Sequence, residues 1–276
     1  MSILTFNLSV SDRKNVSSID EPFQIMPATN NFLTDKSISS YLTSSNPNIL
    51  LHMNYITRVF RKDALELNSL QRRSLKQYVK LGKKLGTKNI LIHMPCNPEE
   101  YENLGYGFKV MYDELVKEGM IIHLEISAWS RDFIDLMDAR NNDPKEYVVG
   151  FITKIMEYAN TFPEGTFYIV FDTAHLFADG CDSEDMFYIV NKFRSKIKYV
   201  HLNGDINSKY NTDSHVPIFS PKNKMNDWNK VCEFCASLGV VCVAEITKMG
   251  SKWEDWEQFA NEFGFKLVKR NDKYSY

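Results

Sequence analysis

Residues 167–175 read Phe-Tyr-Ile-Val-Phe-Asp-Thr-Ala-His, an apolar run that ends on an acid and, three residues later, a histidine. A short run of β-branched and aromatic residues bounded by turn or helix signals is typical of a buried strand. The run therefore predicts a strand over Phe167–Phe171, with Asp172 and His175 just beyond its carboxyl end.

Seven further runs of this kind predict strands along the chain. They are Leu4–Val10, Phe23–Pro27, Ile49–Met53, Ile90–Met94, Ile121–Ile126, Ile197–Leu202 and Val240–Ile246. Segments with the apolar spacing of a helix separate most of the strands. They are Leu67–Leu85, Glu99–Glu118, Pro144–Phe162, Ser183–Phe193, Asp227–Leu238 and Trp253–Phe263.

The alternation of strands and helices indicates the fold class. Apolar strands that are each followed by an amphipathic helix indicate a parallel sheet covered on its faces. Eight such units in 276 residues favour a closed barrel, so we expect a single α/β domain over residues 1–276, a TIM-type (β/α)8 barrel. Residues 11–22 and 34–47 are rich in Ser, Asn and Asp, so the first connections are expected to be irregular.

Composition and the amino terminus bound the cellular setting. The chain is 43% hydrophobic, enough for a large core, and no apolar run approaches the roughly 18 residues of a membrane span. Charged residues at 12–14 interrupt any export signal, so we expect an intracellular protein, cytoplasmic or nuclear or carried in a virion, and not a secreted one. We expect it to be a monomer.

The five cysteines are interpreted as structural. Their odd number favours a reducing compartment. Cys232 and Cys235 form a Cys-x-x-Cys pair, but it lies inside a predicted helix with no second pair nearby, where cysteines serve as small apolar side chains. Cys96 and Cys181 lie close to candidate ligands without occupying a strand end, and we interpret both as bystanders.

Nine imidazole and carboxylate side chains lie at or just beyond the carboxyl ends of the predicted strands. They are His52, His93, Glu125, Asp172, His175, His201, Asp213, His215 and Glu245. Because the strands of a barrel deliver their last inward side chains to one mouth, we expect the nine to converge. Oxygen and imidazole ligands without thiolates suit zinc, manganese or iron, and nine ligands exceed the need of one ion. Two or three metal ions are therefore predicted.

In order and spacing, this set resembles the endonuclease IV family of abasic-site DNA repair nucleases, TIM barrels of the xylose-isomerase-like superfamily. The resemblance runs from the second strand to the eighth. Its specific features are Asp172-x-x-His175, His201-Leu-Asn, Asp213-x-His215 and the late Glu245. The resemblance implies a centre of three zinc ions, although manganese in one or more sites would suit the same ligands.

The resemblance also assigns ligands to each ion. The first zinc would be held by His52, His93 and Glu125. Glu125 would bridge to a second zinc, held also by Asp172, His201 and Glu245. The third zinc would be held by His175, Asp213 and His215.

The implied activity is hydrolysis of the phosphodiester 5′ to an abasic site in double-stranded DNA, leaving a 3′-hydroxyl and a 5′-deoxyribose phosphate. Glu125, Asp172 and Glu245 would act as the catalytic carboxylates of the metal centre. Phosphate-ester hydrolysis needs barrier reductions of about 20 kcal/mol in the slowest cases, and one Lewis acid supplies only several, so several ions would share the work. Three divalent ions would also outweigh the formal net charge of −2, which suits a DNA partner.

Candidate DNA contacts follow the third predicted strand. Tyr55 and Ile56 match the positions where the family inserts a Tyr-Leu wedge into the base stack, and such a wedge would hold a kinked duplex. Packing of Tyr55 on the barrel rim is an equal alternative. Arg58 is a candidate phosphate contact in the same loop.

Three positions depart from the family pattern. Asn7 stands where the family carries a histidine in its first strand, and residues 29–31 lack the arginine that some members insert into DNA. His123 precedes Glu125 by two residues, so both would point to the same side of the strand. We interpret His123 as a packing residue or as a support for the ligands.

Two other interpretations compete with this one. A sugar isomerase or epimerase of the xylose-isomerase-like family would use Glu125, Asp172, His201 and Glu245 around one ion, but it would leave the other five candidate ligands without a role. A DNA-binding or structural protein on a degenerate barrel would be expected to have lost some ligands, whereas all nine are present.

Overall fold

Parallel strands and the helices between them make up the chain, which is described by a computed structural model. The structure describes residues 1–8, 21–27, 33–39, 45–53, 67–94, 106–129, 131–140, 142–206, 215–245 and 252–268. It divides into two units. Unit 1 comprises Met1–Asn7, Ile126–Val149 and Ile169–Tyr276, and unit 2 comprises Leu8–Glu125 and Gly150–Tyr168. Within the described ranges, no helix is both long and apolar enough to cross a bilayer.

Unit 2 is built on four parallel strands. They are β2 (Phe23–Ile25), β3 (Ile49–His52), β4 (Asn89–His93) and β5 (Ile121–Glu125). Neighbouring strands pair in chain order, and the register sets His93 opposite Glu125 at the carboxyl ends of β4 and β5. The strand residues are almost all buried, as expected for parallel strands covered by helices. Two candidate ligands therefore end neighbouring strands on the same level.

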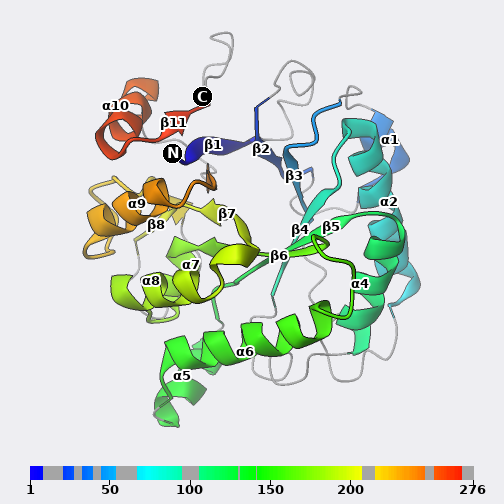
Figure 1. Cartoon of the computed structure of the whole chain (residues 1–276), viewed down its shortest axis with the longest axis horizontal. Helices are drawn as coiled ribbons and strands as arrows, with labels where there is room; N and C mark the ends of the chain where they lie inside the picture. The colour runs from blue at the N-terminus through cyan, green and yellow to red at the C-terminus, as the bar shows by residue number, and fades with distance from the viewer. Residues whose placement is uncertain are drawn as a thin grey trace. The chain divides into compact units, whose positions relative to one another are not determined.

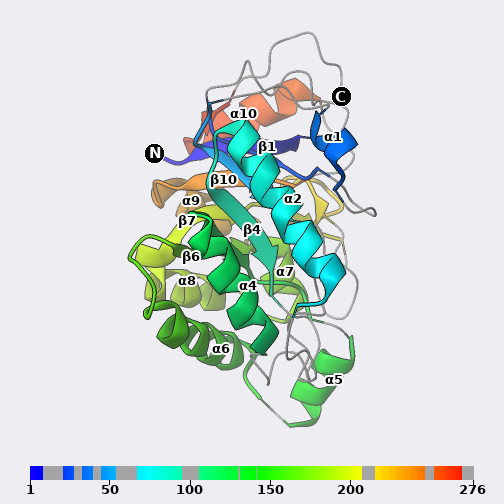
Figure 2. The ribbon, with the colours of Figure 1, turned by 90° about the vertical axis from the view of Figure 1, so that its right-hand side faces the viewer.

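The helices of unit 2 pack beside these strands. They are α1 (Asp35–Ser39), α2 (Ser69–Leu85), α4 (Tyr106–Lys117) and most of α6 (Pro144–Ala159). Figure 2 shows α2 and α4 running side by side past β4. The chain defines both ends of α2: Asn68 and Gln71 form a capping box, and Gly86, with φ of 75°, takes the left-handed conformation that ends the helix.

Unit 1 holds the first strand together with the last ones. Its strands are β1 (Ile3–Leu8), β6 (Phe167–Asp172), β7 (Ile197–His201), β10 (Val241–Ala244) and the short β11 (Lys266–Leu267). The pairings are parallel: β6 with β7, β7 with β10, and β10 with β1. Asp172 lies opposite His201 in the β6–β7 register. Because β1 pairs with β10, the first strand of the chain is joined to the last of the eight predicted strands.

Helices and a small hairpin complete unit 1 (Figure 1). The helices are α5 (Arg131–Ala139), α7 (Thr173–Ala178), α8 (Ser183–Lys192), the 3-10 turn η4 (Arg194–Lys196), α9 (Trp228–Ser237) and α10 (Trp253–Phe263). The hairpin pairs β8 (Gly204–Asp205) with β9 (His215–Val216), antiparallel. Trp256 of α10 is fully buried and packs edge-on against Phe6 and Phe219, which anchors α10 to β1 and to the loop after the hairpin.

The predicted fold class is confirmed: the chain is an α/β protein with a (β/α)8 barrel fold. Each of the eight predicted strands is present, shorter than predicted by one to three residues in most cases. The sequence patterns missed α1, α5, α7, β11 and the β8–β9 hairpin. All of these except α5 have six or fewer residues, too few to show a period. The α1 helix lies inside residues 34–47, which were expected to form an irregular connection.

Gly204, in the β8–β9 hairpin, packs closely against the side chain of Asn223. A Cβ atom added there would lie 2.6 Å from Cγ of Asn223. Asn223 has little freedom to move, because its Oδ1 accepts from the Asp205 and Met225 amides and its Nδ2 donates to the Ile218 carbonyl. We expect Gly204→Ala to lower the free energy of unfolding by about 1–3 kcal/mol, measured by urea denaturation.

Gly150→Ala is the matched control for this substitution. A Cβ atom at Gly150, inside α6, would meet nothing within 4 Å. Alanine is favoured over glycine in a helix by roughly 0.5–1 kcal/mol, so the control should be neutral or stabilising. An equal loss of stability in both proteins would show that the Asn223 contact is not what Gly204 protects.

Candidate metal centre

Unit 2 brings His52, His93 and Glu125 together at the carboxyl ends of β3, β4 and β5. The Nε2 atoms of His52 and His93 lie 3.0 Å apart. Oε2 of Glu125 lies 3.4 Å from Nε2 of His52 and 3.3 Å from Nε2 of His93. His52 and Glu125 are buried, and His93 is largely so. The three ligand atoms form a nearly equilateral triangle with sides of 3.0–3.4 Å.

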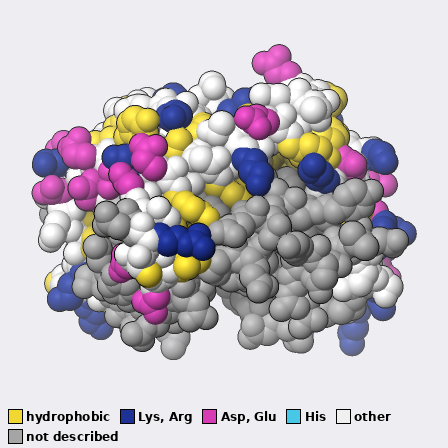
Figure 3. Space-filling view, turned by 90° about the horizontal axis from the view of Figure 1, so that it is seen from below, with side chains coloured by type: hydrophobic (Ala, Val, Ile, Leu, Met, Phe, Trp, Pro, Cys, Tyr) yellow, Lys and Arg dark blue, Asp and Glu magenta, His cyan; other side chains and the backbone are white. Residues whose placement is uncertain are grey.

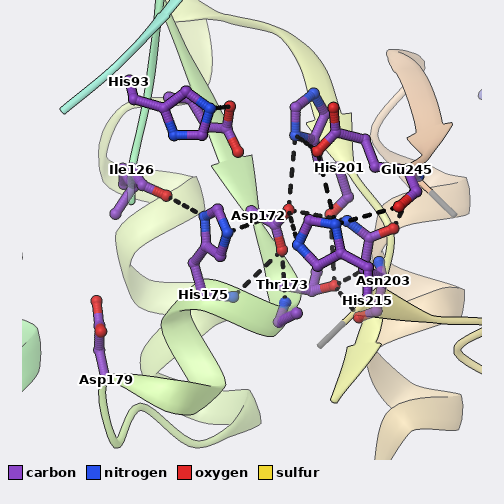
Figure 4. A network of polar contacts seen from close by, with 12 residues as sticks. His93, Ile126, Asp172, Thr173, His175, Asp179, His201, Asn203, His215 and Glu245 are labelled. Carbon is purple, nitrogen blue, oxygen red and sulfur yellow. Dashed lines mark hydrogen bonds and ion pairs between the residues drawn. The ribbon is translucent and has the colours of Figure 1, made fainter. Parts of the chain in front are cut away.

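Unit 1 gathers a second group around Asp172, at the end of β6 (Figure 4). Oδ2 of Asp172 lies 3.3 Å from Nε2 of His215, 3.5 Å from Nδ1 of His201 and 4.0 Å from Nε2 of His175. Oε2 of Glu245 lies 3.1 Å from Nδ1 of His201. Asp172 is therefore shared by two sets, one with His175 and His215 and the other with His201 and Glu245.

Hydrogen bonds to backbone carbonyls define the proton positions of three histidines. Nδ1 of His52 lies 3.1 Å from the Met53 carbonyl, and Nδ1 of His175 lies 2.7 Å from that of Ile126. Nδ1 of His215 lies 3.1 Å from the carbonyl of Glu245. Because a carbonyl only accepts, Nδ1 must carry the proton in each case, and in a neutral ring Nε2 then presents a lone pair. These lone pairs face the carboxylate oxygens.

The geometry fits divalent metal ions. A lone pair on Nε2 of His52 or His215 and a carboxylate oxygen 3.3–3.4 Å away repel one another unless a proton or a metal ion lies between them. A tetrahedral zinc ion with bonds of about 2.0–2.1 Å holds its ligand atoms about 3.3 Å apart. Carboxylates as buried as Glu125 and Asp172, both 0% exposed, need compensating positive charge. The donors in each unit therefore suit a metal such as zinc.

Asp172 is oriented by its own helix and by its neighbour. Its Oδ1 caps α7, accepting from the Ala174 and His175 amides, which leaves Oδ2 to face the imidazoles. Oδ2 also accepts from the Asn203 carboxamide at 2.8 Å. The sequence patterns noted Asn203 only as part of a run with His201, and its hydrogen bonds became visible only in the fold.

Asp179, which directly follows α7, is a buried acid that the sequence patterns did not single out. Its Oδ1 accepts from the Trp129 amide at 2.7 Å, and its Oδ2 is buried with no hydrogen-bond partner among the described residues. Burial raises the pKa of the Asp179 carboxyl well above its usual range, a shift that the Trp129 amide only partly opposes. Asp179 thus supports the loop after β5, the loop whose Ile126 carbonyl orients His175.

The remaining predicted positions fall into two classes. Asp213, Tyr55, Ile56, Arg58, Cys96 and residues 29–31 lie outside the described residues. His123 does not join a ligand group of the described chain: it is buried, its Nε2 lies 3.0 Å from Oδ1 of Asn89, and its ring stacks on Tyr168. Asn7 has a buried Oδ1 without a partner in the described ranges.

The described cysteines carry free, buried thiols. They are Cys181, Cys232, Cys235 and Cys242. Burial raises the pKa of the Cys181 and Cys232 thiols well above their usual range, and a hydrogen bond with Cys235 together with burial does so for Cys242. Protonated, buried thiols are poor nucleophiles and poor metal ligands, which agrees with their interpretation as apolar fillers.

No family model and no curated protein matches this sequence. Solved structures do match its fold. The African swine fever virus AP endonuclease has a TM-score of 0.58 and 13% identity, covering 95% of this chain and 97% of its own. Endonuclease IV from Thermus thermophilus has a TM-score of 0.57 and 15% identity over the same shares. A xylose isomerase domain protein from Planctomyces limnophilus has a TM-score of 0.54 and 11% identity, again over 95% and 97%.

Proposed function

We propose that this chain is a DNA repair endonuclease that hydrolyses the phosphodiester 5′ to an abasic site, using three zinc ions. The observation that supports this most is the presence of ligand groups beyond the four residues of a single-metal isomerase site. The triangle of His52, His93 and Glu125, and the pairing of His175 and His215 with Asp172, have no use in a one-ion sugar isomerase. One of the matching structures is an AP endonuclease and another is an endonuclease IV.

The proposed ligand sets combine the geometry within each unit with the resemblance, which alone supplies Asp213. His52, His93 and Glu125 hold the first ion; Asp172, His201 and Glu245 hold the second; and His175, His215 and Asp213 hold the third beside Asp172. In this proposal Glu125 would also serve as a ligand of the second ion, as the resemblance implies. Manganese would be accepted by the same oxygen and nitrogen donors.

The chain's own residues prepare this centre for phosphate chemistry. Zinc ions would supply an activated water near neutral pH and would neutralise phosphate oxygens. The carbonyls of Met53, Ile126 and Glu245 hold three imidazoles with Nε2 toward the carboxylates, so the ligands need little rearrangement when ions bind. Glu125, Asp172 and Glu245 act through the ions they hold, and no separate general acid is needed.

Electrostatics also point to the metal centre as the source of DNA attraction. The formal net charge is −2. Figure 3 draws one face of the molecule, and on its coloured part Lys and Arg side chains are interspersed with Asp and Glu. The charge of three divalent ions would change the sign of the field at the site. Duplex DNA containing an abasic site is the proposed partner.

Incision and metal content together test the proposal. A duplex with a single abasic site should be cut on its 5′ side, producing a 3′-hydroxyl end that a polymerase extends. Purified protein should contain close to three metal ions per chain by elemental analysis. One ion per chain, with no cleavage of abasic DNA, would favour the sugar isomerase or epimerase instead.

Tyr55 and Ile56 are the proposed wedge, and Arg58 is a proposed phosphate contact. Tyr55→Ala should reduce the preference for abasic over undamaged duplex by about tenfold, because an inserted aromatic side chain contributes roughly 1–3 kcal/mol of stacking. Competition binding with the two duplexes measures this preference, and metal content should stay unchanged. An unchanged preference would assign Tyr55 to packing on the rim.

A further inference from the structure

The carboxamide of Asn203 is placed between two of the candidate ligands. We propose that Asn203 is a positioning residue for the second and third metal sites, an inference that rests on the proposed function. It lies just beyond β7 and is fully buried. Its Nδ2 donates to Oδ2 of Asp172 at 2.8 Å, and its Oδ1 accepts from the backbone amide of Glu245 at 2.9 Å. Figure 4 shows Asn203 between these two residues.

The carboxamide of Asn203 is suited to both tasks. A donor is needed toward Asp172 and an acceptor toward the Glu245 amide, and the asparagine side chain presents one of each in a single plane. Thr173 holds the backbone of Asn203 in place from the other side, since its Oγ1 accepts from the Asn203 amide and donates to the Asn203 carbonyl. Hydrogen bonds therefore hold both the side chain and the backbone of Asn203.

The Asn203 bond determines which lone pair of Asp172 faces the imidazoles. Oδ1 of Asp172 is already occupied by two amides of α7, so Oδ2 is the oxygen that both metal sets share. The N–H of Asn203 occupies one lone pair of Oδ2, and the other is left for the side on which Nδ1 of His201 and Nε2 of His215 lie. Without it only the two α7 amides on Oδ1 hold the carboxylate, so its rotation about χ2 is less restricted and Oδ2 can turn away.

The same carboxamide also positions the ligands on β10 and in the hairpin. By holding the Glu245 amide, Asn203 places the Glu245 carboxylate beside His201. The Glu245 carbonyl in turn accepts from Nδ1 of His215. One side chain thus links the ends of β6, β7 and β10 with the hairpin that carries His215.

Loss of the Asn203 carboxamide is expected to lower the zinc affinity of some metal sites and not of others. Removing a hydrogen-bond partner of a metal ligand lowers metal affinity by about 10–100-fold. Asn203→Ala therefore weakens zinc binding at the second site, which contains Asp172, and at the third site beside it. The group of His52, His93 and Glu125 has its own support in the Met53 carbonyl, so its ion is retained at wild-type affinity.

The experiment is zinc titration of the full chain against a chromophoric chelator, with the thermal stability of the metal-free protein measured alongside. Asn46→Ala is the matched control, because Asn46 is also a buried asparagine whose side chain joins two backbone groups, the Glu21 carbonyl and the Asn48 amide, and it lies in no ligand group of the described chain. The expected result is three tight zinc ions in the wild type and the control, and one tight and two weakened ions in Asn203→Ala.

The outcomes separate this role from a purely structural one and from the proposed function. Equal zinc affinities in Asn203→Ala and wild type, with or without a loss of metal-free stability, refute the positioning role alone. A wild type that binds no zinc refutes the proposed function and this role with it. Should Asn203→Ala fail to fold, an experimental structure of the zinc-loaded wild type decides: the role requires the carboxamide within about 3.2 Å of Oδ2 of Asp172, and a carboxamide turned away overturns it.

Discussion

Asp172→Asn is expected to lower the rate of abasic-site incision by at least about 10³-fold. Among the described residues of unit 1, Asp172 is the ligand shared by two metal sets, and asparagine removes its negative charge. Loss of one properly bound ion costs several kcal/mol of transition-state stabilisation, and each 1.36 kcal/mol is a factor of ten in rate. Single-turnover incision with saturating zinc measures the effect.

The substitution keeps the cap of α7 but replaces Oδ2, which accepts from Asn203, with an N–H donor, so the stability of the metal-free variant is measured alongside its activity. Asparagine caps helices as well as aspartate does, and its Oδ1 retains the Ala174 and His175 amides. Asp182→Asn is the matched control: Asp182 caps α8 in the same way and lies in no ligand group of the described chain. Equal activity of both variants would remove Asp172 from the mechanism.

Glu125→Gln is expected to reduce incision by a similar factor, about 10³-fold or more, for a different reason. Glu125 is the carboxylate that lies beside both His52 and His93 in unit 2, and it is fully buried. Glutamine keeps the size but loses the charge, so the first ion binds weakly and the proposed bridge to the second ion is lost. Metal content should fall by at least one ion per chain.

Glu118→Gln provides the comparison for this variant. Glu118 follows α4 on the surface and pairs with Lys83, an exposed ion pair of little energetic weight. Incision and metal content should match the wild type. Intact cleavage by Glu125→Gln would discredit the bridging role while leaving the Asp172 group open to test.

The positions of candidate ligands at strand ends could be predicted from sequence because that signal is local. Each apolar run predicts its own strand, and a residue one or two positions beyond the run is at the strand's end whatever the rest of the chain does. This is why His52, His93, Glu125, Asp172 and His201 were found without knowledge of any contact. The weak points were short elements such as α7, whose six residues begin at the Asp172 cap and show no measurable period.

The hydrogen bonds that orient the candidate ligands could not be predicted from sequence, because they join residues far apart in the chain. The Ile126 carbonyl and Nδ1 of His175 are 49 residues apart, and Asn203 reaches Asp172 across 31 residues and the Glu245 amide across 42. No spacing rule links such pairs, because they meet only when strands pair in register. His123 shows the same limit: it shares a strand with Glu125, yet it packs on Asn89 and Tyr168 instead of joining the ligands.

From the sequence alone came the alternation of strands and helices, the barrel fold and the side chains available as ligands, because these depend on periodicity and residue type within short segments. Tertiary structure alone decided which histidine nitrogen carries the proton, which oxygen of Asp172 faces the imidazoles, and that a single carboxamide links three strand ends. These properties depend on distances of about 3 Å between atoms far apart in the chain, and such distances exist only once the strands are paired and the helices packed.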